Sequence, residues 1–377
     1  MKIIIAPDSF KGSLSAKEVA NAIEIGIRRV FYDIEIIKVP MADGGEGTVQ
    51  SLVDTTGGRI VNVKVLDPLC REINSFYGLL GDGKTAVIEM AAASGLTLLK
   101  EDERNPMITT TYGTGQLITH ALDMGCRNII MGIGGSATND GGAGMAAALG
   151  VKFINAVGEE IGFGGGALRE LHTMDIAGLD KRIGSCCIAV ACDVTNPLTG
   201  IEGTSYVFGP QKGADKTMIR ILDENLKKYG QILEKDLGVS LLNVPGAGAA
   251  GGLGAGALAF LNAGIRRGID IVIETTGLEE KLIGADLVIT GEGMIDHQTI
   301  YGKTPHGVAK LAAKYKIPVV GITGEIGKGI DVLYNHGFNS IFSIADKPMT
   351  LMESMERGQE LLQDTSERIM RLFSINY

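Results

Sequence analysis

A strand-to-helix turn near the N-terminus gathers side chains that could bind an anion. The segment A6-P-D-S-F-K-G-S13 places one acid, one lysine and two hydroxyls ahead of a helix N-terminus. A cation, hydroxyl groups and helix amides together favour anion binding. We predict that Asp8, Ser9 and Ser13 bind a small substrate and that Lys11 supplies the cation for charge developing during catalysis. In the alternative interpretation, Ser13 and Ser15 cap the helix and Lys11 is solvated.

A second glycine-rich turn, P40-M-A-D-G-G-E-G-T48, carries two acids. Carboxylate and hydroxyl oxygens are ligands that Mg²⁺ prefers in proteins. We predict that Asp43 and Glu46 bind the metal. The alternative is an acidic helix N-terminus with no ligand.

The longest glycine-rich segment is G132-I-G-G-S-A-T-N-D-G-G-A-G-M145, between an apolar strand and an alanine-rich helix. A loop with many amide donors and few side-chain restraints can wrap a polyphosphate. We predict nucleotide phosphate binding here, by Gly134, Gly135, Ser136, Thr138, Asn139, Asp140 and Gly142.

The other candidates are two acids and two lysines at predicted strand ends or helix starts. Phosphoryl transfer to a hydroxyl needs a phosphate cradle, Mg²⁺ carboxylates, a cation and an acid that handles the hydroxyl proton. Asp193 follows an apolar strand and precedes a rigid T-N-P turn, so we predict it as the base, with Asp296 as the second choice. Lys212 and Lys303 are predicted to bind substrate.

Two familiar patterns are rejected on their context. The segment G78-L-L-G-D-G-K-T85 matches the P-loop pattern, but D-G predicts a hairpin and a strand follows where the motif needs a helix. The segment G246-A-G-A-A-G251 matches the dinucleotide fingerprint after a strand-like S-L-L-N-V, with Asp270 at a plausible distance for a ribose partner. Since a glycine- and alanine-rich tract produces this match easily, a nucleotide-dependent oxidoreductase of small hydroxy acids is only the alternative function.

The elements around these segments predict an α/β protein. Strands 2–6 and 34–39 flank a helix that a capping box opens at Ser15, which is the start of a parallel sheet. Residues 59–90 alternate without helices and predict antiparallel strands. Helices are expected around 216–236 and over 351–373. I-T-G-E occurs at 289–292 and again 33 residues later, each time ending an apolar strand in a predicted Gly-Glu loop.

This pattern predicts two domains. A doubly wound parallel-sheet domain comprises residues 1–65 and 275–377, and a mixed α/β domain with the glycine-rich loops, 66–274, is inserted into it. The ligand is expected at the carboxyl ends of the parallel strands.

Composition limits the kinds of partner that this protein is expected to bind. The 377-residue chain has a net charge of −9 without long charged blocks, which argues against nucleic acid or an anionic membrane surface as the main partner. Its five cysteines lack metal-ligand spacing and predict free thiols in a reducing, cytoplasmic environment. The uncharged stretch 241–265 is mostly Gly and Ala and is not expected to cross a membrane. A homo-oligomer is compatible with the sequence.

Taken together, these segments resemble the bacterial glycerate kinases of the first class. The resemblance runs from A-P-D-S-F-K-G-S-L-S and P-M-A-D-G-G-E-G-T to T-G-E-G-M-I-D-H-Q-T-I-Y-G-K-T-P, over essentially the whole chain. It implies transfer of the ATP γ-phosphoryl group to D-glycerate, with Mg²⁺, on a two-domain α/β fold unrelated to P-loop kinases. The product it implies is 2-phosphoglycerate, with 3-phosphoglycerate as the alternative.

Overall fold

The computed structural model describes residues 1–376, and these form two compact units. The first unit contains residues 1–43, 50–57 and 268–377, and the second contains residues 44–49 and 58–267. Residues 44–49, 58–65 and 268–274 therefore fall on the opposite side of this division from the predicted one. Whether either part folds as an independent domain stays a prediction.

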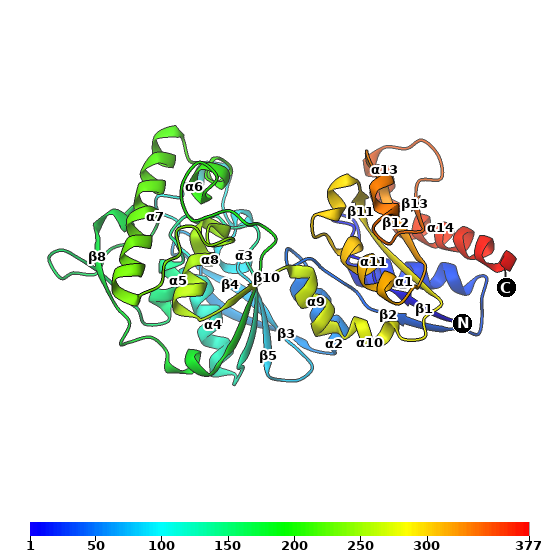
Figure 1. The fold of residues 1–377 in the computed structure, drawn as a ribbon, viewed down its shortest axis with the longest axis horizontal. Coiled ribbons are helices and arrows are strands. Elements are labelled where there is room, and N and C mark those ends of the chain that lie inside the picture. The colour runs from blue at the N-terminus through cyan, green and yellow to red at the C-terminus, as the bar shows by residue number, and fades with distance from the viewer. Residues whose placement is uncertain (377) are drawn as a thin grey trace. The chain divides into compact units, whose positions relative to one another are not determined.

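The first unit is built on a five-stranded sheet in the order β13-β12-β11-β1-β2, in which every neighbouring pair is parallel (Figure 1). The strands are β1 (Lys2–Ile5), β2 (Glu35–Lys38), β11 (Leu287–Ile295), β12 (Val319–Ile326) and β13 (Ser340–Ser343). The chain runs outward from β1 to β2 in one direction and from β11 to β13 in the other. The strand order therefore reverses between β1 and β11, which makes this the topological switch point of the sheet.

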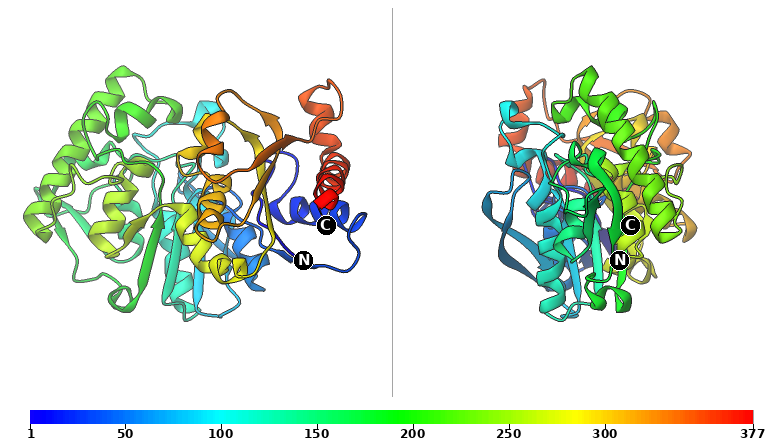
Figure 2. Two further views of the ribbon diagram at one scale, coloured as in Figure 1. Left: turned by 45° about the vertical axis from the view of Figure 1, so that its right-hand side comes forward. Right: turned by 90° about the vertical axis from the view of Figure 1, so that its left-hand side faces the viewer.

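One face of this sheet is covered by α1 (Ala16–Arg28) and α14 (Gly358–Phe373), which lie side by side although they are distant in sequence (Figure 2). The predicted capping box is confirmed, because the Ser15 side chain accepts from the Glu18 amide while Glu18 reaches back to Ser15. The unit's other helical elements are α9 (Gly268–Thr276), α10 (Leu278–Leu282), η6 (His297–Ile300), α11 (Thr304–Lys314), α12 (Asp331–Tyr334), α13 (Leu351–Glu356) and η7 (Ser374–Asn376).

Two local predictions in this unit are wrong. The helix predicted over 351–373 is interrupted at Arg357, where Gly358 packs against Ser13 and Leu14 so tightly that an added Cβ would lie 2.9 Å from the Ser13 hydroxyl. The two Gly-Glu pairs are not loops. β11 and β12 run through them as paired strands, because Gly291 allows the backbones to approach. Glu292 and Glu325 therefore project from strands.

The second unit contains a six-stranded mixed sheet in the order β10-β9-β6-β5-β4-β3. The predicted antiparallel region is confirmed, since β3 pairs antiparallel with β4 and β4 with β5, whereas the remaining pairs are parallel. The strands are β3 (Arg59–Leu66), β4 (Glu72–Leu79), β5 (Thr85–Glu89), β6 (Asn128–Gly132), β9 (Cys187–Ala191) and β10 (Gly264–Arg266), with a separate hairpin of β7 (Lys152–Asn155) and β8 (Leu171–Asp175). The P-loop match is a hairpin turn, as predicted, in which Asp82 accepts hydrogen bonds from Lys84 and Thr85.

The helices of the second unit include the predicted long helix, now α7 (Lys216–Leu237). The others are α3 (Ala91–Ser94), α4 (Tyr112–Asp123), α5 (Ala143–Ala148), α6 (Thr204–Phe208) and α8 (Ala249–Phe260), with η1 (Leu96–Leu98), η2 (Glu101–Glu103), η3 (Ala167–Glu170), η4 (Lys181–Ser185) and η5 (Pro210–Lys212). α2 (Thr48–Thr56) begins in this unit and continues in the first.

The segment that matches the dinucleotide fingerprint lacks the geometry of that motif. The strand expected over 240–244 does not form, and the backbone enters the left-handed region at Ala250, Gly251 and Gly252. An added Cβ at Gly252 would lie 2.9 Å from Gly141 Cα, so this turn is packed against protein. No helix among residues 1–376 is long and apolar enough to cross a membrane.

Candidate functional site

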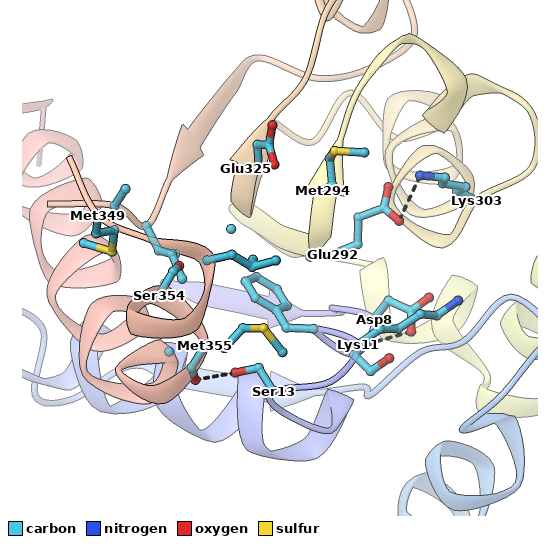
Figure 3. Close-up of a pocket in the computed structure, with 18 of the residues that line it drawn as sticks. Asp8, Lys11, Ser13, Glu292, Met294, Lys303, Glu325, Met349, Ser354 and Met355 are labelled. Carbon is cyan, nitrogen blue, oxygen red and sulfur yellow. Dashed lines mark hydrogen bonds and ion pairs between the residues drawn. The ribbon is translucent and has the colours of Figure 1, made fainter. Parts of the chain in front are cut away.

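A cavity of about 750 Å³ opens in the first unit (Figure 3). Its lining comes from the carboxyl ends of β1, β11, β12 and β13, and from α13. This is where ligands bind in open parallel sheets. Four charged side chains meet at its polar end, beside the switch point between β1 and β11: Asp8, Lys11, Glu292 and Lys303.

Asp8 is the most constrained of these groups. Its side chain is 7% exposed, and its two oxygens accept hydrogen bonds from the Thr304 hydroxyl (2.6 Å) and the Ser9 amide (2.6 Å). Burial, and then the nearby charge of Asp43, raise the pKa of Asp8 to about 6. The hydrogen bonds and Lys11 oppose the shift but do not cancel it. A carboxylate with a pKa this close to neutrality can exchange protons at working pH.

Glu292 lies on β11 next to this acid. Its carboxylate is 3.5 Å from the Lys303 ammonium and accepts a hydrogen bond from the Thr299 hydroxyl at 3.0 Å. Burial raises the pKa of Glu292 to about 7 despite the Lys303 charge, and Asp8 contributes to the rise. Of the two acids in the segment 291–296, sequence reasoning selected Asp296 and not Glu292. The apolar run before I-T-G-E was the signal in the sequence that could have placed Glu292 on a buried strand.

The other predicted residues of the first unit take several roles. Ser9, Ser13 and Asp43 line the cavity, as does the exposed Lys11. The Ser13 hydroxyl is already engaged, since it donates to the Met355 carbonyl at 2.7 Å. Asp296 caps η6 by accepting from the Gln298 amide at 2.8 Å and is not among the residues that line the cavity.

In the second unit, the glycine-rich segment 132–144 is largely closed by its own hydrogen bonds. Asp140 is buried and accepts from the amides of Gly142 (3.1 Å) and Gly144 (3.2 Å) and from the amide and hydroxyl of Thr111. The amides of Gly142 and Gly144, in the segment that was predicted to bind phosphate, are therefore directed at a protein carboxylate. Gly134 and Gly135 are the exposed part of this segment, and Gly134 lies close to Gly45.

Lys212 is enclosed beneath the same segment. It is 1% exposed, and its ammonium donates to the Thr138 carbonyl at 2.6 Å. Burial lowers the pKa of Lys212 to about 7, although Asp140 opposes the shift. Asn139 is also buried, and its amide nitrogen donates to Ser205 at 3.1 Å. Ser136 is buried as well.

The remaining acids of the second unit do not form a metal cluster with one another. Asp193 and Glu46 are exposed. Glu89, which sequence reasoning missed, accepts from the Val49 amide at the start of α2 (2.8 Å), and burial raises the pKa of Glu89. Across the part of the chain that the structure describes, no group of three His, Cys, Asp or Glu side chains is arranged to hold a metal ion.

Comparison with known proteins shows to which family this chain belongs. The sequence profile of the glycerate kinase family matches residues 3–374. The chain belongs to the glycerate kinase family. It is 54% identical to the glycerate kinase of Bacillus subtilis, covering 98% of this chain and 97% of the relative. It is 52% identical to the glycerate 2-kinase of Escherichia coli, with coverages of 100% and 98%.

A solved structure also supports the fold of this glycerate kinase family member. A crystal structure assigned to glycerate kinase 2 of Salmonella typhimurium LT2 is similar with a TM-score of 0.93 and 52% identity, covering 100% of this chain and 99% of that one. The predicted fold class, an α/β protein with a doubly wound parallel sheet and an inserted mixed part, is confirmed. The predicted kinase family is confirmed as well, and nothing in the family match supports the oxidoreductase alternative.

Within this family member, the predicted site residues divide between the two units. The first unit holds Asp8, Ser9, Lys11, Ser13, Asp43, Asp296 and Lys303. The second holds Glu46, Gly134, Gly135, Ser136, Thr138, Asn139, Asp140, Gly142, Asp193 and Lys212. The predicted charged groups that share the cavity are all in the first unit: Asp8, Lys11, Asp43 and Lys303.

Proposed function

We propose that this protein transfers the γ-phosphoryl group of ATP to the C2 hydroxyl of D-glycerate, forming 2-phosphoglycerate and ADP. One observation carries the proposal: two carboxyls with raised pKa values and two lysines meet at the switch point of a parallel sheet, on the wall of a cavity. The name of the Escherichia coli relative, glycerate 2-kinase, supports the C2 hydroxyl over C3.

Each of these groups has a chemical task in the transfer. Lys11 and Lys303 attract the glycerate carboxylate and the phosphate oxygens, which the net charge of −9 would otherwise repel. Asp8 accepts the hydroxyl proton as the hydroxyl oxygen bonds to the γ-phosphorus and the bond from that phosphorus to the ADP oxygen breaks. Glu292 positions Lys303 through their ion pair.

We favour Asp8 over Asp193 as the base because the environments of the two acids differ. Asp8 is buried on the cavity wall and its pKa is raised to about 6, so it is ionised at neutral pH yet basic enough to take a proton. Asp193 is exposed in the second unit. The role of Asp193 stays a prediction from the sequence, and so does that of Asp296.

Magnesium fits the donor set at the polar end of the cavity. Asp43 offers carboxylate oxygens beside Asp8, and a Mg²⁺ ion carried on ATP needs only one or two protein carboxylates, since phosphates and water complete its shell. Bound there, the ion would neutralise charge on the transferring phosphoryl group. Phosphate contacts from Gly134 and Gly135, metal binding by Glu46, a cytoplasmic location and a homo-oligomer stay predictions.

The direct test is an ADP-release assay across small hydroxy acids, followed by ³¹P NMR of the product. A phosphate on C2 couples to a single carbon-bound proton and gives a doublet, whereas a phosphate on C3 couples to two and gives a triplet. The proposal expects D-glycerate-dependent ADP release and a doublet. A triplet would move the product to 3-phosphoglycerate, and ADP release that does not depend on any hydroxy acid would refute the kinase assignment.

A further inference from the structure

The cavity of the first unit has an apolar end that the chemistry proposed above does not use. Away from the charged cluster, its wall is mostly apolar and is formed by Phe10, Ile344, Met349, Leu351 and Met355, together with Lys347. Met294 lies between this end and Lys303. In Figure 3, Met349 and Ser354 lie on one side of the cavity, while Asp8, Lys11 and Lys303 lie on the other. These apolar residues come from the β1–α1 turn, β11, and the segment from β13 into α13.

The size and polarity of the two proposed substrates, D-glycerate and ATP, indicate which of them would occupy the apolar end of the cavity. D-glycerate has no apolar surface beyond its three-carbon chain, and each carbon carries an oxygen. An apolar wall therefore contributes little to binding it, and would leave its hydroxyls without partners. The whole cavity, about 750 Å³, is of the size that holds a drug-sized ligand.

We propose that the apolar end of this cavity binds the adenosine moiety of ATP, with the triphosphate directed toward Lys11 and Lys303. This inference rests on the proposed kinase function and names the place of its phosphoryl donor. It differs from the sequence prediction, which assigned the nucleotide to the segment 132–144 of the second unit.

The chemistry of the wall suits a flat aromatic base. Three methionines, Met294, Met349 and Met355, supply flexible thioether side chains, and sulfur makes favourable contacts with aromatic rings. Ser354 lies on the same side as Met349 and Met355 and can hydrogen-bond to the polar edge of the base. The lysines at the opposite end provide the positive charge that a triphosphate requires.

A single tryptophan can report occupancy of this end. The chain contains no tryptophan, so an introduced one is the only indole in the molecule. Met349→Trp places it on the cavity wall. Met352→Trp is the matched control, because Met352 is 71% exposed, three residues away, and does not line the cavity. We expect ADP to change the emission of Met349→Trp saturably and to leave Met352→Trp unchanged, whereas D-glycerate alone changes neither.

A second variant, Met294→Glu, tests by kinetics the part of the wall between the apolar end and Lys303. Met294 is 43% exposed, so the fold should tolerate the change, while a carboxylate there opposes both an apolar base and the phosphates. We expect the ATP KM to rise by about tenfold or more and the D-glycerate KM to change by less than about threefold. Binding of a fluorescent ADP analogue, measured without glycerate, should weaken in parallel.

The outcomes separate this inference from the proposed function. If the wild-type protein phosphorylates D-glycerate while Met294→Glu keeps a normal ATP KM and Met349→Trp does not respond to ADP, the nucleoside lies elsewhere and the inference is wrong. If the wild-type protein phosphorylates a different hydroxy acid and both variants behave as expected, the nucleoside assignment stands and the acceptor assignment fails.

Discussion

The charged cluster of the first unit and the glycine-rich segment of the second use similar residues in opposite ways. In both, an aspartate and a lysine lie near loops that follow parallel strands. Asp8 and Lys11 line a cavity, whereas Asp140 and Lys212 are buried and form hydrogen bonds with Thr111 and with backbone groups of the glycine-rich segment. An acid, a lysine and glycines in a loop therefore do not by themselves identify a ligand site. The two regions differ in whether their polar groups face a cavity or form hydrogen bonds within the protein.

The largest effect is expected at Asp8. Asp8→Asn removes the group proposed to accept the hydroxyl proton, and kcat should fall by about 10³-fold, within the range for general base catalysis, with a small change in ATP KM. Raising Mg²⁺ should not restore it. Wild-type kcat should also decline as pH falls through about 6, because protonated Asp8 cannot accept a proton.

Asp193→Asn is the matched control for this prediction. It should keep kcat within about threefold of wild type if Asp8 is the base. The reverse pattern, a large metal-independent loss in Asp193→Asn and near-normal turnover in Asp8→Asn, would restore the assignment that the sequence favoured.

The next largest effect is expected at Lys11, and Lys212 provides the comparison. Lys11→Ala should lower kcat/KM by about 10²-fold, the scale expected for losing a positioned charge at developing negative charge. Lys212→Met removes the bond to the Thr138 carbonyl but keeps a long apolar chain in the buried site. It should keep kcat/KM within about threefold and show its effect as a shifted melting temperature. A loss in Lys212→Met as large as in Lys11→Ala, in a folded protein, would show that the enclosed cluster takes part in the reaction.

Sequence patterns predicted the fold better than the site. The capping box at Ser15 and the antiparallel region 59–90 follow from local residue types and periodicity, and both formed as expected. Burial and pairing of charges depend on residues far apart in sequence, such as Asp8 with Thr304, 296 positions away. The enclosure of Asp140 by Thr111 and the neighbouring amides also depends on tertiary contacts. No spacing rule in a single sequence contains this information.

A smaller effect, on stability, is expected at Glu292. Its pKa is raised from 4.5 to about 7, so the folded protein holds this proton more tightly than the unfolded chain. Stability is therefore lost as pH rises from about 4.5 to about 7, and the loss is complete above pH 7. Glu292→Gln stays neutral, and its melting temperature relative to wild type should rise across that interval by a few degrees.

Glu325→Gln is the control for that experiment, because Glu325 occupies the equivalent place in the second I-T-G-E segment, lines the same cavity and is exposed. Its melting temperature should follow wild type at every pH. A pH-independent difference between Glu292→Gln and wild type would mean that the carboxyl of Glu292 titrates alike in the folded and unfolded protein.

The smallest effect is expected at the exposed tip of the glycine-rich segment, at Gly134 and Gly135. Variants of these two adjacent glycines distinguish the effect of backbone strain from the effect of a lost phosphate contact. Gly135 has φ +72°, so Gly135→Val is strained whatever it touches and should lower the melting temperature by itself. Gly134 has no such φ, and an added Cβ would find its nearest neighbour, Gly45 Cα, at 3.8 Å. Gly134→Ala should therefore fold normally. With the nucleoside in the first unit and the amides after Asp140 already occupied, its ATP KM should change by less than about twofold. A clear rise in ATP KM for Gly134→Ala at unchanged melting temperature would instead mean that this tip contacts the nucleotide, as its glycines first suggested.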